Sequence, residues 1–217
     1  MARNTGLLTL VLCALAARAD ATPAPTLFRL TVAGTASASW DYTGPAVDRA
    51  DCSSSESSRG SRTVRFDSRP TRVRYTVGRI AAVTVRGVKG SLAVFGKNTE
   101  NLTCAGVETH MPVACVDTTR EFRSGHLVLF SPARAKVAVR APGGMPARSQ
   151  CPREPREVAP LGPRPTFRVP AALFERERVV RITLTASASQ RKVYGDPEAG
   201  TLQQRSSWKL TFVRVQP

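Results

Sequence analysis

Residues 71–77 read TRVRYTV, and this short stretch decides the fold class. Its apolar residues, Val73, Tyr75 and Val77, alternate with basic and hydroxyl residues. Strict alternation over several residues is typical of a β-strand that buries one face. The opposite face of this strand would carry the two arginines.

The same period of two recurs along the chain, and no stretch keeps a helical period. Only residues 170–176 look like a possible helical turn. The alternating segments are 28–33, 63–67, 72–77, 83–86, 92–94, 127–129, 137–139, 180–185 and 208–213. Short strands at this spacing, often ended by Gly or Pro, predict an all-β fold: an antiparallel β-sandwich, or a barrel-like sheet, of about nine strands.

Two tryptophans stand in similar surroundings near the two ends of this pattern. Trp40 and Trp208 each follow a Gly-Thr pair by a few residues. One interpretation is that the first and last strands are neighbours and both tryptophans close the core; the other is that so short a match is a coincidence.

The N-terminus has the three parts of a secretory signal peptide. Arg3 gives a positive start, residues 6–17 are apolar, and residues 19–21 offer small side chains for cleavage. The apolar part is shorter than the roughly 20 residues that span a membrane. We therefore predict that residues 1–21 are removed and that 22–217 form one exported domain, secreted or extracytoplasmic.

The cysteines support an oxidising compartment. Cys13 falls in the predicted signal, and because Leu12 rather than a small residue precedes it, a lipid anchor there is not favoured. An even number of cysteines in an exported chain predicts disulfides, and the absence of any C-x-x-C pair disfavours zinc.

Four cysteines allow three pairings. The ten-residue gap between Cys104 and Cys115 favours a bridge across a short loop, which leaves Cys52 with Cys151 to tie two long loops together.

Two stretches are predicted to be disulfide-pinned loops. Residues 48–61 (DRADCSSSESSRGS) are polar and serine-rich, and residues 142–170 hold eight of the sixteen prolines. If the second stretch were a linker between domains, 166–217 would have to fold alone with few strands. We therefore expect a single domain with a long external Pro-rich loop.

Positive charge is the clearest functional signal. The chain has 32 Lys and Arg against 16 Asp and Glu, for a net charge of +16. A GC-rich genome would favour arginine whatever the function, whereas an anionic partner would select its planar guanidinium for phosphate, sulfate or carboxylate. Both explanations remain open.

Several basic residues fall opposite the apolar face of their strands. They are Arg65, Arg72, Arg74, Arg86, Lys136, Arg140 and Arg181. If these strands share one sheet, like charges would lie side by side, which destabilises a sheet unless an anion intervenes. If the arginines are spread over separate surfaces, they only keep the protein soluble.

We accordingly predict a non-enzymatic secreted protein that binds an anionic polymer or cell-envelope surface, such as an envelope polysaccharide, through these strand faces. Nucleic acid is not favoured, because no aromatic residues interleave with the basic ones. The oligomeric state is not predicted, and a partner that pairs with an exposed strand edge would leave no trace in the sequence.

The sequence holds no catalytic, metal or cofactor motif. His110 and His126 are the only histidines, no G-x-S-x-G elbow is present, and no cofactor is predicted. The alternative function is an extracellular hydrolase that uses paired carboxylates near the Pro-rich loop. The candidate pairs are Glu154 with Glu157 and Glu175 with Glu177.

Overall fold

The computed structural model describes residues 25–215, and the predicted signal peptide lies outside them. The prediction of an all-β antiparallel fold is confirmed. The strands are β1 (Thr26–Thr43), β2 (Val47–Arg49), β3 (Cys52–Asp67), β4 (Thr71–Thr76), β5 (Arg79–Ile80), β6 (Val83–Cys104), β7 (Val107–Ala114), β8 (Thr118–Phe130), β9 (Lys136–Gly143), β10 (Thr166–Arg168), β11 (Arg181–Tyr194) and β12 (Ala199–Arg214). One short helix, α1 (Ala171–Glu175), occupies the predicted helical turn.

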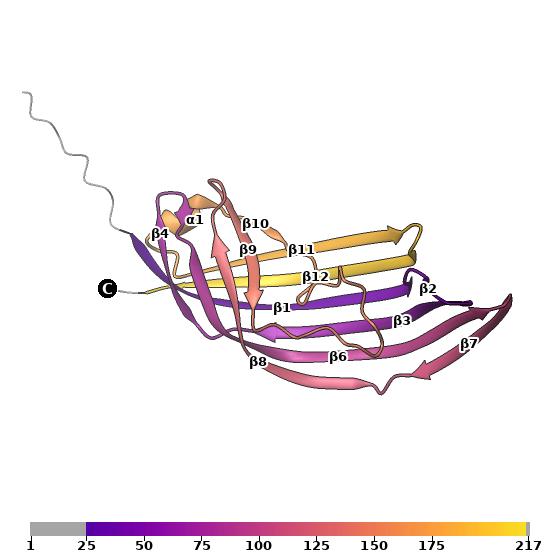
Figure 1. Ribbon diagram of the computed structural model, residues 1–217. Helices are drawn as coiled ribbons and strands as arrows, with labels where there is room; N and C mark the ends of the chain where they lie inside the picture. The colour runs from indigo at the N-terminus through magenta and orange to yellow at the C-terminus, as the bar shows by residue number, and fades with distance from the viewer. Residues whose placement is uncertain (1–24, 216–217) are drawn as a thin grey trace, which may run out of the picture.

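These twelve strands belong to one continuous sheet that does not close on itself. Its main path runs β10-β9-β8-β6-β3-β1-β12-β11, and the four remaining strands pair at its margins. In Figure 1 the long strands lie side by side as a curved sheet, with β4, β8 and β9 crossing them at one end. β1 pairs with β12 along its length, so the first and last strands are neighbours as predicted.

Two differences from the sequence prediction explain the larger number of strands. The separate segments 83–86 and 92–94 belong to the single strand β6, which stays continuous through bulges between Val85 and Gly90. Residues 48–61, expected as a loop, instead supply most of β2 and the first part of β3. That expectation was wrong because β3 lies between β1 and β6, where both edges of its backbone are hydrogen-bonded whatever its side chains.

The sheet has an inner face, which carries the buried side chains, and an outer face. In residues 71–77, Val73 and Tyr75 are buried on the inner face, while Arg72 and Arg74 are exposed. Val77 lies beyond the end of β4 and is exposed, contrary to its place in the alternation. Trp40 and Trp208 are both buried in the core, as predicted.

Aromatic residues fill the end of the sheet where the strands cross. Phe174 from α1 lies at the centre of this cluster, with its ring centroid 5.3 Å from that of Phe28, 5.1 Å from Phe212 and 4.8 Å from Tyr75. The short helix therefore closes this end by inserting one fully buried side chain.

The Pro-rich segment (residues 144–165) covers the inner face rather than forming the expected external loop. Figure 1 shows it above the concave side of the sheet, and Val158 and Leu161 are buried in the core. Buried backbone groups must be hydrogen-bonded, and proline has no N–H to satisfy. A proline-rich chain is therefore easier to bury without secondary structure than an ordinary loop.

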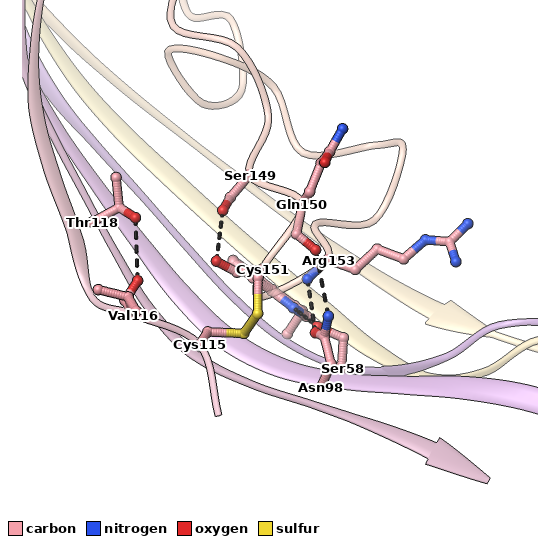
Figure 2. Close-up of a disulfide and its surroundings, with 10 residues drawn as sticks. Ser58, Asn98, Cys115, Val116, Thr118, Ser149, Gln150, Cys151 and Arg153 are labelled. Carbon is pink, nitrogen blue, oxygen red and sulfur yellow. Dashed lines mark hydrogen bonds between the residues drawn. A yellow bond between two sulfur atoms is a disulfide. The ribbon is translucent and has the colours of Figure 1, made fainter. Parts of the chain in front are cut away.

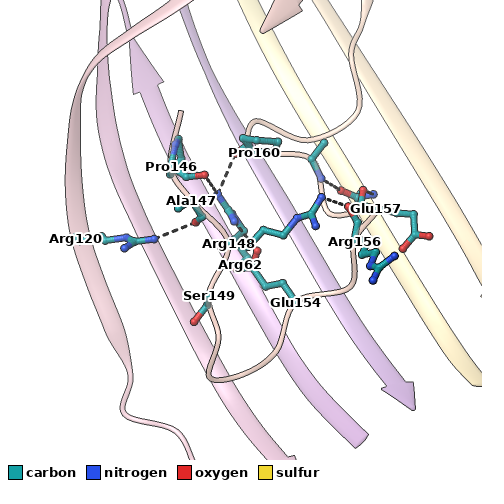
Figure 3. Close-up of polar contacts among 12 residues, drawn as sticks. Arg62, Arg120, Pro146, Ala147, Arg148, Ser149, Glu154, Arg156, Glu157 and Pro160 are labelled. Carbon is teal, nitrogen blue, oxygen red and sulfur yellow. Dashed lines mark hydrogen bonds and ion pairs between the residues drawn. The ribbon is translucent and has the colours of Figure 1, made fainter. Parts of the chain in front are cut away.

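A buried ion pair fastens this segment to the sheet. Arg62 of β3 points toward the inner face and donates from Nη1 to Oε2 of Glu154 at 2.7 Å, and both side chains are almost completely buried. Figure 3 shows the Arg62 guanidinium enclosed by the segment, where Nη2 lies 3.4 Å from the carbonyl oxygens of Pro146 and Pro160. Burial lowers the pKa of Arg62, and the Glu154 charge opposes that shift.

The disulfides join Cys52 to Cys104 and Cys115 to Cys151, so the predicted pairing was wrong. The gap after Cys104 is not a short loop, because β7 occupies it. This strand has 8 residues and thus spans about 26 Å, which separates Cys115 from Cys104. Cys104 instead faces Cys52 directly across the β3–β6 ladder.

The second disulfide ties the Pro-rich segment to the chain that enters β8. Figure 2 shows Cys151 beside Asn98 of β6, whose Oδ1 accepts a 2.9 Å hydrogen bond from the Arg153 N–H and whose Nδ2 lies 3.4 Å from the Gln150 carbonyl oxygen. Two disulfides indicate an extracytoplasmic environment, because reducing compartments keep such thiols free.

Candidate functional site

The seven basic residues singled out from the sequence are all exposed and all belong to the single sheet. They do not form one patch. Arg72 lies directly opposite Arg29 across the β1–β4 pair, and Lys136 lies opposite Arg168 across β9–β10. Like charges thus face each other at two separate places, and each pair joins one of the seven residues to a basic residue outside the set.

Arg65 and Arg86 line two adjoining hollows on the outer face. The hollows measure about 1040 Å³ and 600 Å³ and share Arg69, Lys89 and Arg123 as lining residues. We call the two together the basic hollow. Its basic side chains are Arg65, Arg69, Arg86, Lys89, Arg123 and Lys209, and its acidic side chains are Asp67 and Glu121.

Small neighbours keep the floor of the basic hollow low. Arg65 on β3 is flanked by Thr35 on β1 and Ser91 on β6, and Lys209 on β12 by Ala33 and Thr185. Because these short side chains stand beside long basic ones, the charged groups rise at the rim over an open floor.

A glycine in the bulge of β6 positions one of the arginines. Gly87 has φ +66°, a conformation that favours glycine, and a Cβ added there would lie 3.2 Å from Cδ of Arg69. The Arg69 side chain, which comes from the turn before β4, therefore lies directly against the β6 backbone. This contact brings it beside Arg86 in the hollow.

The acids of the basic hollow neutralise only part of its charge. Asp67 lies 3.9 Å from Nζ of Lys89, and Glu121 accepts a 2.9 Å hydrogen bond from Arg123. Within residues 25–215, the basic side chains that line the hollow without an ion pair are Arg65, Arg69, Arg86 and Lys209. This leaves a locally positive surface suited to an anionic ligand.

Sequence reasoning missed four of the six basic residues. Arg69 lies in a turn, so no alternation could place it. Arg123 and Lys89 lie close to bulges of the β6–β8 ladder, where the period of two is interrupted. Lys209 was the detectable case, because it falls between Trp208 and Leu210 on the side opposite the core.

The carboxylates considered for a hydrolase have other partners. Glu154 is buried against Arg62, and Glu157 accepts hydrogen bonds from Lys192 and, at 2.8 Å, from Tyr194. Burial would raise the pKa of Glu157, but these hydrogen bonds outweigh burial and lower it.

The second candidate pair lies beside α1. Glu175 accepts a 3.1 Å hydrogen bond from the Tyr75 hydroxyl, and Glu177 is exposed. The carboxylates that were candidates for catalysis are thus mostly engaged in contacts that hold elements together, and hydrolysis stays an untested alternative.

Neither a cluster of metal-ligand side chains nor a membrane-length apolar helix is found among the described residues. Within 25–215 no group of three His, Cys, Asp or Glu side chains gathers as a metal site would require. His110 instead contacts Asn101, with 2.9 Å between Nδ1 and Oδ1. In the same range, no helix has the length and apolar character needed to cross a bilayer.

Two tyrosines, Tyr42 and Tyr194, lie at the end of the sheet opposite α1 and have raised pKa values. The Tyr42 hydroxyl donates to Oε1 of Glu198 at 2.7 Å, and its ring packs edge-on against Tyr194 at 4.7 Å. Burial, followed by the hydrogen bond and the charge of Glu198, raises the pKa of Tyr42 to about 12. Burial and the bond to Glu157 raise the pKa of Tyr194 further.

We expect this pair to make the protein sensitive to alkali. The pKa of Tyr42 in the folded protein exceeds the ordinary tyrosine value of 10. The protonated hydroxyl therefore contributes its full stabilisation of the folded state below pH 10, and this contribution is lost as the pH rises toward 12. In an ultraviolet titration of the folded protein, all three tyrosines should remain protonated above pH 10, because burial raises the pKa of Tyr75 as well. Glu198→Gln should lower the pKa of Tyr42, and an unchanged titration would contradict the assignment.

Comparisons with known proteins assign no family to the chain. No protein-family model matches it, and no curated protein matches it. Among solved structures, the chain is similar to "The crystal structure of Ail, the attachment invasion locus protein of Yersinia pestis", at 7% identity over 88% of this chain and 100% of that chain, with a TM-score of only 0.19. The fold and the site therefore define only a class of protein: an open, disulfide-linked, all-β protein with a basic hollow on its outer face.

Proposed function

We propose that this protein binds an anionic polymer outside the cytoplasm, through the basic hollow, and that it does so without catalysis. One observation carries the proposal: six basic side chains and only two acidic ones line two adjoining hollows on a single face. An envelope polysaccharide bearing carboxylate, phosphate or sulfate groups would supply the missing negative charge.

The chemistry of the hollow suits a chain better than a compact ion. Arginine binds phosphate, sulfate and carboxylate through paired N–H donors. Arg65 lines the larger hollow and Arg86 the smaller, with Arg69 common to both. A polymer lying across the two hollows would contact these residues in succession, and several weak contacts would add to useful affinity.

We also propose that the signal peptide predicted at residues 1–21 is cleaved and that the protein is exported. Cleavage after residue 21 and export fit the two disulfides, and a secreted or envelope-bound location would expose the hollow to anionic cell-surface polymers. N-terminal sequencing of the protein recovered from culture medium tests cleavage directly.

Retention on sulfated polysaccharide should depend on the basic hollow and on salt. We expect the oxidised protein to bind a sulfated column, to pass through a neutral one, and to elute as salt screens the charges. Arg65→Ser/Arg69→Ser/Arg86→Ser should weaken binding and reduce the slope of log affinity against log salt by roughly one for each arginine that pairs with the polymer. Titration of the protein with the soluble polymer measures this slope.

The matched control removes the same charge elsewhere on the exposed strand faces. Arg72→Ser/Arg74→Ser/Arg140→Ser alters three exposed arginines that do not line the hollow. Binding should change much less in this variant. Equal losses in both variants would show that only net charge matters, and absence of retention on every anionic column would overturn the proposal.

A further inference from the structure

The sheet ends in a long strand with an open edge. β11 pairs with β12 over all 14 of its residues without a register shift, and it pairs with no other strand among the described residues. β10 contacts β11 but is only 3 residues long, so it can shield only a small part of it. The remaining outward backbone N–H and C=O groups of β11 form a template for another strand.

The middle of this edge lacks the features that usually protect a strand from pairing. The exposed edge of β7 carries Glu108 and Pro112, and the first part of β8 carries Arg120, Glu121 and Arg123. Residues 182–190 of β11 contain no charge, no proline and no bulge. Natural edges that lack all three devices tend to be covered by another chain.

We propose that β11 pairs antiparallel with β11 of a second copy of this chain, joining two sheets into one. Two like strands related by a two-fold axis present the same surface to each other, so the contact closes after two copies. A head-to-tail contact with the opposite end of the sheet is unsuitable, because β10 is too short to match β11. This inference goes beyond the proposed function and does not depend on it.

Side chains near the middle of β11 leave room for the partner. On the outer face they are Thr185, Ser187 and Ser189, all exposed, and on the inner face Ala186 and Ala188, both half-buried. Such small residues allow a neighbouring strand to approach at the usual spacing of about 4.8 Å without a clash.

The charges at the ends of β11 select the register. If Ala186 lies on the two-fold axis, Arg181 of one copy faces Arg191 of the other, and like charges directly opposite are unfavourable. If Ser187 lies on the axis, Arg181 faces Val193, which is 67% exposed in the single chain. The second register buries apolar surface and separates the arginines, so we infer that Ser187 lies on the axis.

Sedimentation of charge variants tests the interface. The protein should sediment as a dimer at moderate salt, where repulsion between two chains of charge +16 is screened. Thr185→Lys/Ser189→Lys should raise the dimer dissociation constant by about tenfold or more, because lysines would face lysines across the axis. Thr185→Glu/Ser189→Glu should do the same, and an equimolar mixture of the two variants should recover the dimer.

The matched control is Ser39→Lys/Thr63→Lys, which adds the same charge to exposed positions on the interior strands β1 and β3. It should remain dimeric. A protein that is monomeric at every concentration up to its solubility limit would overturn the inference, as would a lysine variant that dimerises like the unaltered chain. Retention on sulfated polysaccharide is measured separately. A monomeric protein that still binds the polysaccharide would refute only the dimer, and a dimeric protein that fails to bind it would refute only the proposed function.

Discussion

Replacing Glu154 with leucine is expected to lower the free energy of unfolding by about 3–5 kcal/mol. The substitution keeps roughly the same volume but leaves the Arg62 guanidinium buried without its counter-charge. Both members of this pair are almost fully buried between β3 and the Pro-rich segment, so water cannot take the place of the missing carboxylate (Figure 3). Unfolding in urea, followed by tryptophan fluorescence, measures the change.

A second substitution should reverse most of this loss. In Arg62→Met/Glu154→Leu no buried charge remains, and replacing a buried ion pair by packed apolar residues is often neutral or stabilising. Nε of Arg62 and Oε1 of Glu154 are buried without a hydrogen-bond partner among the described residues, so the native pair is not fully satisfied. A double variant as unstable as Glu154→Leu would contradict this account.

The exposed pair between Asp41 and Arg59 is the control. The Arg59 and Asp41 side chains are 69% and 57% exposed, and Asp41→Asn should therefore cost less than about 1 kcal/mol. The contrast separates the effect of burial from that of charge alone. If the loss in Asp41→Asn matched that in Glu154→Leu, burial would not be the cause.

The alternation of apolar and polar residues was enough to predict the fold class, but not the number of strands. Alternation is visible where a strand buries Val, Leu or Phe, as in residues 71–77. It is invisible in the first part of β3, where Gly60 lies opposite Trp40 and the buried side chain is Ser58, whose hydroxyl accepts a hydrogen bond from the Trp40 indole at 3.0 Å. Backbone pairing to both neighbours, which no local pattern reports, makes this serine-rich stretch a strand.

The candidate site was only partly predictable for a related reason. Alternation shows which side chains leave the core, and it correctly placed Arg65 and Arg86 on the exposed side. It cannot show which exposed residues meet, because that depends on strand order and on turns. Arg69 reaches the basic hollow only because the chain turns after β3 and Gly87 leaves space beside it.

Removing the disulfide between Cys115 and Cys151 is expected to lower the free energy of unfolding by about 4 kcal/mol, since the bridge closes a 36-residue loop in the unfolded chain. In Cys115→Ala/Cys151→Ala the cross-link between the chain that enters β8 and the Pro-rich segment is lost. Urea unfolding of this variant measures the loss. Proteolytic fragments of the unreduced native protein should contain Cys115 joined to Cys151, and fragments joining Cys104 to Cys115 would refute the pairing itself.

The other disulfide provides the comparison, because it closes a loop of 52 residues and so predicts a similar loss of about 4 kcal/mol. The two variants should differ in where the native structure loosens. Cys52 and Cys104 face each other in a ladder that is already hydrogen-bonded, so their removal should increase amide exchange only at the tip where β6 meets β7. Removal of Cys115–Cys151 should instead increase exchange around Asn98 and Arg153, whose 2.9 Å hydrogen bond it holds in place (Figure 2). If exchange rose equally over the whole sheet in both variants, the Pro-rich segment would not be an independently tethered cover of the inner face.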